Sequence, residues 1–293
     1  MSNNTSVLDI YGDYRDVDLD YGMTSQDYFV HMLRFSKVID MVHGKNIFDI
    51  GCGKYTNLLK ALCMMRRGPD FKMYIGTDYG KCHRWRQDYA PIWDKALIYD
   101  EMDFTDDDDF DIISDALMTL FGDEPFVITC FEVLEHMSFD MQNKFLYNLS
   151  KILHNPKLNV ECCLFSTPNH NGSPAKNHIS EISYVLEEEM FDRFDIQVVQ
   201  AQGLSAWKKY CKKENLAEGA AVPQYVEFMP AALQKMIWGA ALPRRFSNNI
   251  LYNLTAPKCE LASFEELQKQ PYKWGEYRQG GTAQLACAAL FAK

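Results

Sequence analysis

The sequence predicts an α/β fold, a doubly wound and mostly parallel sheet of seven strands with helices on both faces. Short apolar runs of strand character recur along the first 200 residues, and stretches of helical spacing separate several of them. A glycine-rich turn, Gly51-Cys52-Gly53, joins the first of these runs to a helical stretch. Proteins of this class place their ligands at such turns, where a strand ends and a helix begins.

Each predicted element follows from a local pattern. Apolar residues at spacings of mostly three or four predict a helix over 24–43, with Ser25 as its cap, and another helix is predicted over 57–65. The last predicted strand could also be a short helix by its pattern, and we prefer a strand because it would cover an exposed sheet edge. The predicted strands, in chain order, are 46–50, 72–77, 95–99, 126–130, 161–166, 194–201 and 283–292.

The stretch between the last two predicted strands is interpreted as a helical insertion into a single fold. Helices are expected at 206–217, 231–240 and 263–268, and basic residues exceed acidic ones in this stretch. Its aromatic residues either stack on a planar substrate or form the insertion's own core. The predicted organisation is a core with an N-terminal helical segment at 1–203, a substrate lid at 204–282 and a final core strand at 283–293.

Composition excludes several classes of protein. The hydrophobic fraction of 47% and the charged fraction of 24% are typical of a folded domain, and the net charge of −10 disfavours a surface that grips a polyanion. No apolar run is long enough to span a membrane and the N-terminus does not resemble a signal peptide, so we expect a cytoplasmic protein without a membrane partner. The nine cysteines include no CxxC pair, which favours buried free thiols over a cysteine zinc site.

The glycine turn becomes informative together with the next strand. A GxG turn alone is weak, but the next strand ends in Gly76-Thr77-Asp78, which places a carboxylate where both hydroxyls of a ribose can be bound. A dinucleotide dehydrogenase would use the same acid. It would also carry a third glycine, at the position where this chain has Thr56.

Four motifs in order, DIGCGKYT, GTD, MDF and CFEVLEHM, resemble those of the class I S-adenosylmethionine-dependent methyltransferases. The resemblance covers roughly residues 25 to 200 plus the last predicted strand, and it implies S-adenosylmethionine as cofactor. It also implies that Asp49, Gly51 and Gly53 line the amino acid portion of the cofactor and that Asp78 binds the ribose. The adenine would lie against Asp103 and Phe104. The other residues of the expected cofactor site are Cys52, Tyr79 and Phe131.

Two of these acids have structural alternatives. Asp103 precedes the acidic run 106–109, which a solvated turn would explain. Asp49 could serve only as a buried carboxylate at a strand end that caps loop amides.

A second group of polar residues follows the fourth predicted strand. Glu132, Glu135 and His136 stand at i, i+3 and i+4, so on a helix they share one face and form a candidate divalent metal site. The alternative is that Glu135 and His136 only brace the loop. The ExxEH pattern, followed by TPN and a histidine, resembles metal-dependent O-methyltransferases, including those of ubiquinone biosynthesis and those acting on the terminal 2′-hydroxyl of small RNAs. On that resemblance His178 is the preferred fourth ligand and His170 the reserve, with Mg²⁺, Mn²⁺ and Zn²⁺ all open.

These residues point to an oxygen acceptor, because a bound cation lowers the pKa of a hydroxyl and orients its oxygen. Without a metal, His136 would be the general base. The first hypothesis is an O-methyltransferase acting on a small molecule, and the second is a nucleic-acid methyltransferase of the 2′-O type. The third is a cofactor-binding protein that serves a partner without catalysis. The oligomeric state is not predicted.

Overall fold

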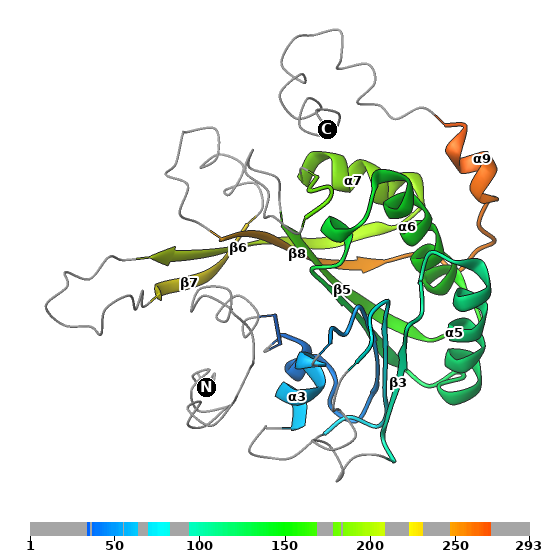
Figure 1. Ribbon diagram of the computed structural model, residues 1–293, viewed down its shortest axis with the longest axis horizontal. Helices are drawn as coiled ribbons and strands as arrows, with labels where there is room; N and C mark the ends of the chain where they lie inside the picture. The colour runs from blue at the N-terminus through cyan, green and yellow to red at the C-terminus, as the bar shows by residue number, and fades with distance from the viewer. Residues whose placement is uncertain are drawn as a thin grey trace, which may run out of the picture.

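The computed structural model describes residues 34–35, 37–54, 56–63, 70–82, 94–168, 178–182, 184–208, 223–230 and 247–270. They form one eight-stranded sheet with helices on both faces (Figure 1). The strands are β1 (Asn46–Ile50), β2 (Tyr74–Asp78), β3 (Ala96–Asp100), β4 (Phe126–Phe131), β5 (Val160–Pro168), β6 (Gln197–Lys208), β7 (Pro223–Pro230) and β8 (Ser247–Thr255). The helices are α3 (Asn57–Cys63), α5 (Asp107–Leu120), η3 (Leu134–His136), α6 (Phe139–His154), α7 (Tyr184–Arg193) and α9 (Phe264–Gln268).

The sheet order is β3-β2-β1-β4-β5-β8-β6-β7. Strands β1 to β5 pair in parallel, whereas β8 lies antiparallel between β5 and β6, and β7 pairs antiparallel with β6. Strand order reverses between β1 and β4, so the carboxyl ends of these two strands border the crevice where this class binds ligands. The predicted doubly wound α/β class is confirmed, with eight strands in place of seven.

The central strands β1 and β4 are buried along almost their whole length, because both faces of the sheet are covered. All five residues of β1 are buried, and so are the first five of β4. Helices α5, α6 and α7 pack on one face around a cluster that includes Phe104, Phe145 and Phe165. Helix α3 packs on the other face with Phe35 and the helical residues 37–41 (Figure 1). The sheet is therefore the middle of three layers.

Six of the seven predicted strands are confirmed, five of them with ends shifted by at most two residues. The sixth, β6, begins three residues later and ends seven residues later than predicted. The helix predicted over 57–65 is α3, and the described part of the helix predicted over 24–43 is helical at 34–35 and 37–41. The strand predicted at 283–292 lies outside the described residues. The described part contains no helix long and apolar enough to cross a membrane.

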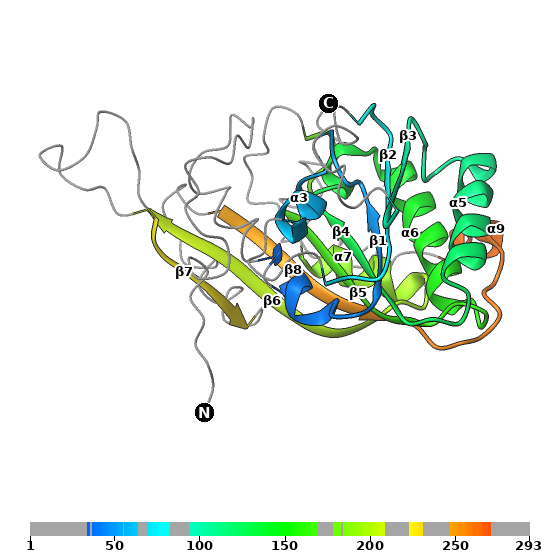
Figure 2. The same ribbon diagram turned by 90° about the horizontal axis from the view of Figure 1, so that it is seen from below.

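The prediction that the insertion is helical is wrong where the structure describes it as sheet. Strand β6 continues through residue 204 to Lys208, so the helix predicted over 206–217 does not begin at 206. Strands β7 and β8 also lie within the insertion, and β8 is the antiparallel neighbour of β5. Figure 2 shows β6 and β7 extending beyond the helical layers. The parts at 209–217 and 231–240 lie outside the described residues.

Strand β8 carries a period-two signal that its asparagines obscure. Ile250, Tyr252 and Leu254 alternate along the strand and join the same core cluster, and Tyr252 is in register with Phe165 of β5. Helix α9 is confirmed near the predicted 263–268. Ser263 caps it in a capping box with Glu266.

Candidate cofactor and metal site

A cavity of about 910 Å³ opens where β1, β2 and β4 end. Its lining includes every expected cofactor residue and every expected metal ligand among the described residues. The expected cofactor residues are Asp49, Gly51, Cys52, Gly53, Asp78, Tyr79, Asp103, Phe104 and Phe131, and the expected ligands are Glu132, Glu135, His136 and His178. The reserve ligand His170 lies outside the described residues.

The glycine turn is bonded to the end of β2. The Gly53 amide donates a hydrogen bond to Asp78 Oδ2 at 2.8 Å, and the Gly80 amide donates to Asp78 Oδ1 at 2.8 Å. The amides of Gly51 and Cys52 donate to the Thr77 carbonyl at 2.8 and 3.0 Å. A carboxylate has about four lone-pair positions, so the hydrogen bonds from described residues leave two on Asp78 for ligand hydroxyls.

Gly51 also brings the turn against the segment that follows β4. Its φ of +69° lies in the left-handed region, and a Cβ added there would lie 2.3 Å from Val133 Cγ2. Val133 is the residue before η3, which carries Glu135 and His136. The cofactor turn and the candidate metal segment are therefore in direct contact.

Asp49 ties three strands together beneath the turn. Its buried carboxylate accepts hydrogen bonds from Tyr74 Oη at 2.5 Å and from Thr129 Oγ1 at 2.7 Å. Burial is the largest influence on this carboxyl and raises its pKa to about 6, against the lowering effect of the two hydroxyls. Asp49 thus connects β1 with β2 and β4. These two hydrogen bonds come from hydroxyl groups, whereas the structural alternative expected hydrogen bonds from loop amides.

At the expected adenine end of the cavity, Asp103 is an acid at the wall and Phe104 is part of the hydrophobic core. Asp103 Oδ1 accepts hydrogen bonds from the amide and the hydroxyl of Thr105, at 2.8 and 2.7 Å. The Phe104 ring packs on Phe145 with centroids 4.9 Å apart. The acidic run at 106–109 is not a solvated turn, because Asp106 caps α5 and the following acids occupy its first turn.

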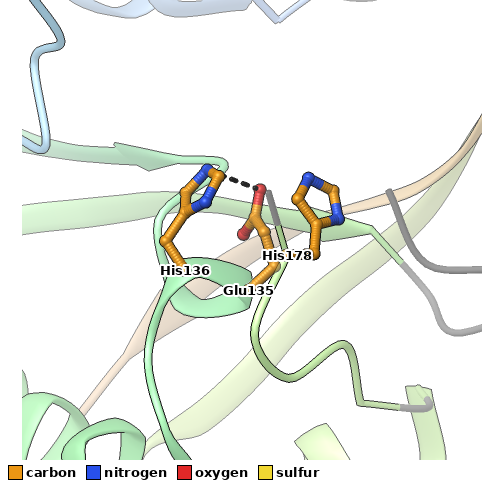
Figure 3. Close-up of side chains that lie close together, drawn as sticks. All are labelled: Glu135, His136 and His178. Atoms are coloured by element: carbon orange, nitrogen blue, oxygen red, sulfur yellow. Dashed lines mark ion pairs between the residues drawn. The ribbon is translucent and has the colours of Figure 1, made fainter. Parts of the chain in front are cut away.

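Three of the four expected metal ligands converge in the cavity. The ligand atoms of Glu135, His136 and His178 all lie within 4.8 Å of one another, and Figure 3 shows the carboxylate between the two rings. The side chain of Glu135 is 1% exposed, and neither of its oxygens has a hydrogen-bond partner among the described residues. Its Oε1 lies 3.9 Å from His136 Nε2. Burial and the nearby Glu132 charge raise the pKa of this carboxyl well above its usual range.

Backbone hydrogen bonds hold His178 beside η3. The amides of Ile179 and Ser180 both donate to the Glu135 carbonyl, at 2.7 and 3.1 Å. Gln142 of α6 donates to the carbonyl of Ser180 at 2.8 Å and also to that of Leu134 at 2.8 Å. A segment far along the chain is thereby fixed against the ExxEH motif.

The other ring nitrogen of His178 has a carboxylate partner. His178 Nδ1 contacts Glu181 Oε1, and both side chains are largely buried. Histidines that bind metals commonly donate their second nitrogen to a carboxylate, which sets the tautomer. This contact leaves Nε2 of His178 as the atom for a ligand.

Glu132 is held outside this group of three. Its Oε1 lies 3.1 Å from Arg34 Nη1 and accepts from Ser166 Oγ at 3.1 Å, and its Oε2 accepts from Asn249 Nδ2 at 2.5 Å. The motif does not form the predicted helix that would place Glu132, Glu135 and His136 on one face. Glu132 has a left-handed backbone conformation with φ of 58°, and the short helix η3 begins two residues later. Glu132 therefore pairs with Arg34 where a metal was expected.

Sequence reasoning did not identify Arg34, Glu181 or Asn249 as part of this site. Arg34 stands in an apolar helical stretch, and Asn249 lies between the helices predicted at 231–240 and 263–268, so neither carried a local signal. Glu181 stands three residues after His178, and that short spacing is the one signal that pointed to it.

No protein-family model matches the chain, and no curated protein matches it. Among solved structures, the small RNA methyltransferase HEN1 is similar with a TM-score of 0.49 and 16% identity, over 83% of this chain. The match spans only 27% of that protein's chain. The N-methyltransferase NodS from Bradyrhizobium japonicum, in complex with S-adenosylhomocysteine, is similar with a TM-score of 0.48 and 11% identity, over 86% of this chain and 97% of that one.

The contact between the turn and Val133 predicts a large cost for a side chain at Gly51. Gly51→Ala should lose about 1–2 kcal/mol through the left-handed backbone and about 1–3 kcal/mol more through the clash. Gly44→Ala is the matched control, because Gly44 has a φ of +63° and nothing within 4 Å of an added Cβ. Urea unfolding should show a larger loss of unfolding free energy for Gly51→Ala than for Gly44→Ala. Adding Val133→Ala to the Gly51→Ala protein should remove the clash and so reduce the cost of the alanine at 51. Equal losses in the two glycine variants would contradict the contact.

Burial of Asp49 predicts a pH-dependent stability. The native carboxyl keeps its proton up to about pH 6, whereas an unfolded aspartic acid releases it near pH 4, so the native state binds more protons between these values. Stability due to Asp49 therefore falls as pH rises through this window, by about 2–3 kcal/mol. Urea unfolding between pH 4 and 7 measures this change. Over that range the unfolding free energy of Asp49→Asn should rise by this amount relative to that of the unsubstituted protein. Parallel pH curves for the two proteins would refute the raised pKa.

Proposed function

We propose that the chain is an S-adenosylmethionine-dependent methyltransferase that transfers a methyl group to a hydroxyl oxygen of a small molecule. The supporting observation is that one cavity contains both the turn bonded to Asp78 and the cluster of Glu135, His136 and His178. A cofactor on the first and an acceptor near the second would share that space. Its volume lies within the range of about 300–1,000 Å³ that is common for ligand sites.

The cofactor half is supported by the fit between the turn and Asp78. The Gly53 amide is 2.8 Å from the carboxylate, so a single nucleoside can contact both. Glycine at 51 keeps the backbone open to a ligand, and the second oxygen of Asp103 is available at the cavity wall. These groups suit a ribose and the adenine amino group.

The metal half is supported by the buried carboxylate of Glu135, which lies 3.9 Å from His136 Nε2 and accepts no hydrogen bond from the described residues. A buried carboxylate without hydrogen bonds is costly, and a cation would satisfy both oxygens at once. Two imidazoles and one carboxylate favour Mn²⁺ or Zn²⁺ over Mg²⁺, which prefers oxygen ligands. In this proposal Glu132 forms an ion pair with Arg34 beside the cluster and is not required as a metal ligand.

The proposed chemistry needs little covalent participation by the protein. Placement of the acceptor oxygen in line with the methyl carbon supplies much of the acceleration. A bound cation supplies Lewis-acid chemistry, which lowers the pKa of the acceptor hydroxyl. Glu135, His136 and His178 would hold the cation, and Asp78 would orient the nucleoside.

The charge of the cavity favours a small acceptor over RNA. Among described residues its wall carries five carboxyl groups and the single guanidinium of Arg34. Even with the carboxyls of Asp49 and Glu135 protonated, acids outnumber that cation. A phosphodiester chain is repelled by such a surface, whereas a neutral alcohol or phenol is not.

Asp78→Asn should weaken binding of S-adenosylhomocysteine about 10- to 100-fold, because hydrogen bonds to a charged group contribute about 1.5–3 kcal/mol. Asp100→Asn is the matched control, since Asp100 is in register with Asp78 on the next strand and bonds the Cys82 amide outside the cavity. Isothermal titration calorimetry measures both. Equal affinity in the two variants would remove Asp78 from the cofactor site.

Glu135→Gln should separate metal binding from stability. Without metal the variant should be at least as stable as the parent protein, because a neutral amide replaces a buried carboxyl whose charged form is disfavoured. With Mn²⁺ the parent should gain thermal stability through binding and the variant should not. His178→Ala should behave like Glu135→Gln in metal titrations, and His43→Ala, an exposed histidine, should behave like the parent. A Mn²⁺ response that survives both Glu135→Gln and His178→Ala would place that ion elsewhere.

Turnover decides between the candidate functions. Formation of S-adenosylhomocysteine should occur with small phenols, catechols or sugar-like alcohols and should require a divalent ion. Turnover only with short RNA bearing a free 2′-hydroxyl would overturn the small-molecule acceptor. Turnover that is insensitive to chelators would leave His136 as general base. Cofactor binding without turnover for any acceptor would identify a non-catalytic protein.

A further inference from the structure

A second group of potential metal ligands lies at the opposite edge of the sheet from the cavity. His154 ends α6 just before β5, Asp195 lies in the turn before β6, and Cys259 follows the antiparallel strand β8. Strands β5 and β6 begin at this edge and β8 ends there, so the topology brings the three residues together. Their ligand atoms all lie within 4.8 Å of one another.

The distances fit tetrahedral zinc. Cys259 Sγ lies 3.3 Å from His154 Nδ1 and 4.0 Å from Asp195 Oδ2. Bond lengths of about 2.3 Å to sulfur and about 2.0–2.2 Å to nitrogen or oxygen place tetrahedral ligands about 3.6 Å apart. The two observed separations lie on either side of that value, so a small movement of exposed Cys259 and Asp195 would accommodate an ion.

The histidine is built into the fold as a fixed ligand. His154 is 2% exposed, and its Nε2 is buried with no hydrogen-bond partner, so its ring is oriented through Nδ1 towards Cys259. Lys258 fixes the neighbouring backbone, because its ammonium donates to the carbonyls of Leu153 and Leu158, each at 2.8 Å. Cys259 is therefore held at the end of α6 by the residue before it.

We propose that His154, Asp195 and Cys259 bind a Zn²⁺ ion that joins the end of α6, the turn before β6 and the segment leading to α9. Thiolate, imidazole and carboxylate together suit zinc among the common divalent ions. Asp195 and Cys259 are exposed, which leaves a route for entry and a fourth position for water. The site lies away from the cavity, so it does not depend on the proposed methyl transfer.

Binding has a defined proton balance. The Cys259 thiol must lose its proton to form the zinc–sulfur bond, and His154 must offer the lone pair of Nδ1. The ion therefore displaces one proton from the thiol to the buffer. Calorimetry in buffers of different ionisation enthalpy measures that proton.

Cobalt substitution tests the proposal in the full chain. Co²⁺ bound by Cys259 should produce a thiolate-to-cobalt charge-transfer band, which the sulfur-free cluster of Glu135, His136 and His178 cannot give. Cys259→Ser should abolish the band, and Asp195→Asn should weaken affinity by more than the roughly 10- to 100-fold that loss of an outer partner costs. Cys63→Ser, at a partly exposed cysteine on α3, should leave the band unchanged.

Zinc stoichiometry and stability give the complementary readout. Zinc should raise the thermal stability of Glu135→Gln protein, and the further substitution Cys259→Ser should remove that gain. A band that persists in Cys259→Ser, cobalt bound without any such band, or no zinc-dependent gain in Glu135→Gln protein would each overturn the site. Reactivity of Cys259 towards alkylating reagents that zinc does not suppress would identify an uncoordinated thiol paired with His154.

Discussion

The hydrogen bond between the Gly53 amide and the Asp78 carboxylate is the contact on which the site depends. It joins the turn after β1 to the end of β2, and the register of these strands sets its length. Below it, Asp49 bonds Tyr74 and Thr129 and holds β1 between its two neighbours. The turn is thereby held in place before any ligand arrives, which reduces the ordering cost of binding.

The same turn connects the cofactor half of the cavity with the cluster of Glu135, His136 and His178. Because Gly51 has no side chain, Val133 can pack directly on it, and this contact fixes the start of η3. The Glu135 carbonyl of η3 then accepts hydrogen bonds from the amides of Ile179 and Ser180, which hold the segment around His178. A displacement at Gly51 would therefore propagate to the cluster through one contact and two hydrogen bonds.

Patterns local in the chain predicted most of the core. The runs 46–50 and 126–130 are buried and mostly apolar, and Asp78 and His178, both expected at the site, line one cavity. What local patterns did not predict depends on long-range contacts. The pairing of β8 with β5, the ion pair of Glu132 with Arg34 and its hydrogen bond from Asn249 all join residues far apart in the chain.

The site opposite the cavity illustrates the same limit. Cysteine spacing gave no indication of a metal site, because Cys259 contributes one sulfur and its neighbours come from two other segments.

For the cavity, the central claim is that one nucleoside bridges the turn and Asp78. A crystal structure with S-adenosylhomocysteine tests it most directly. The account predicts both ribose hydroxyls on the Asp78 carboxylate and the homocysteine end over Gly51. A nucleoside bound elsewhere, with the Asp78 carboxylate contacting only the amides of Gly53 and Gly80, would contradict it.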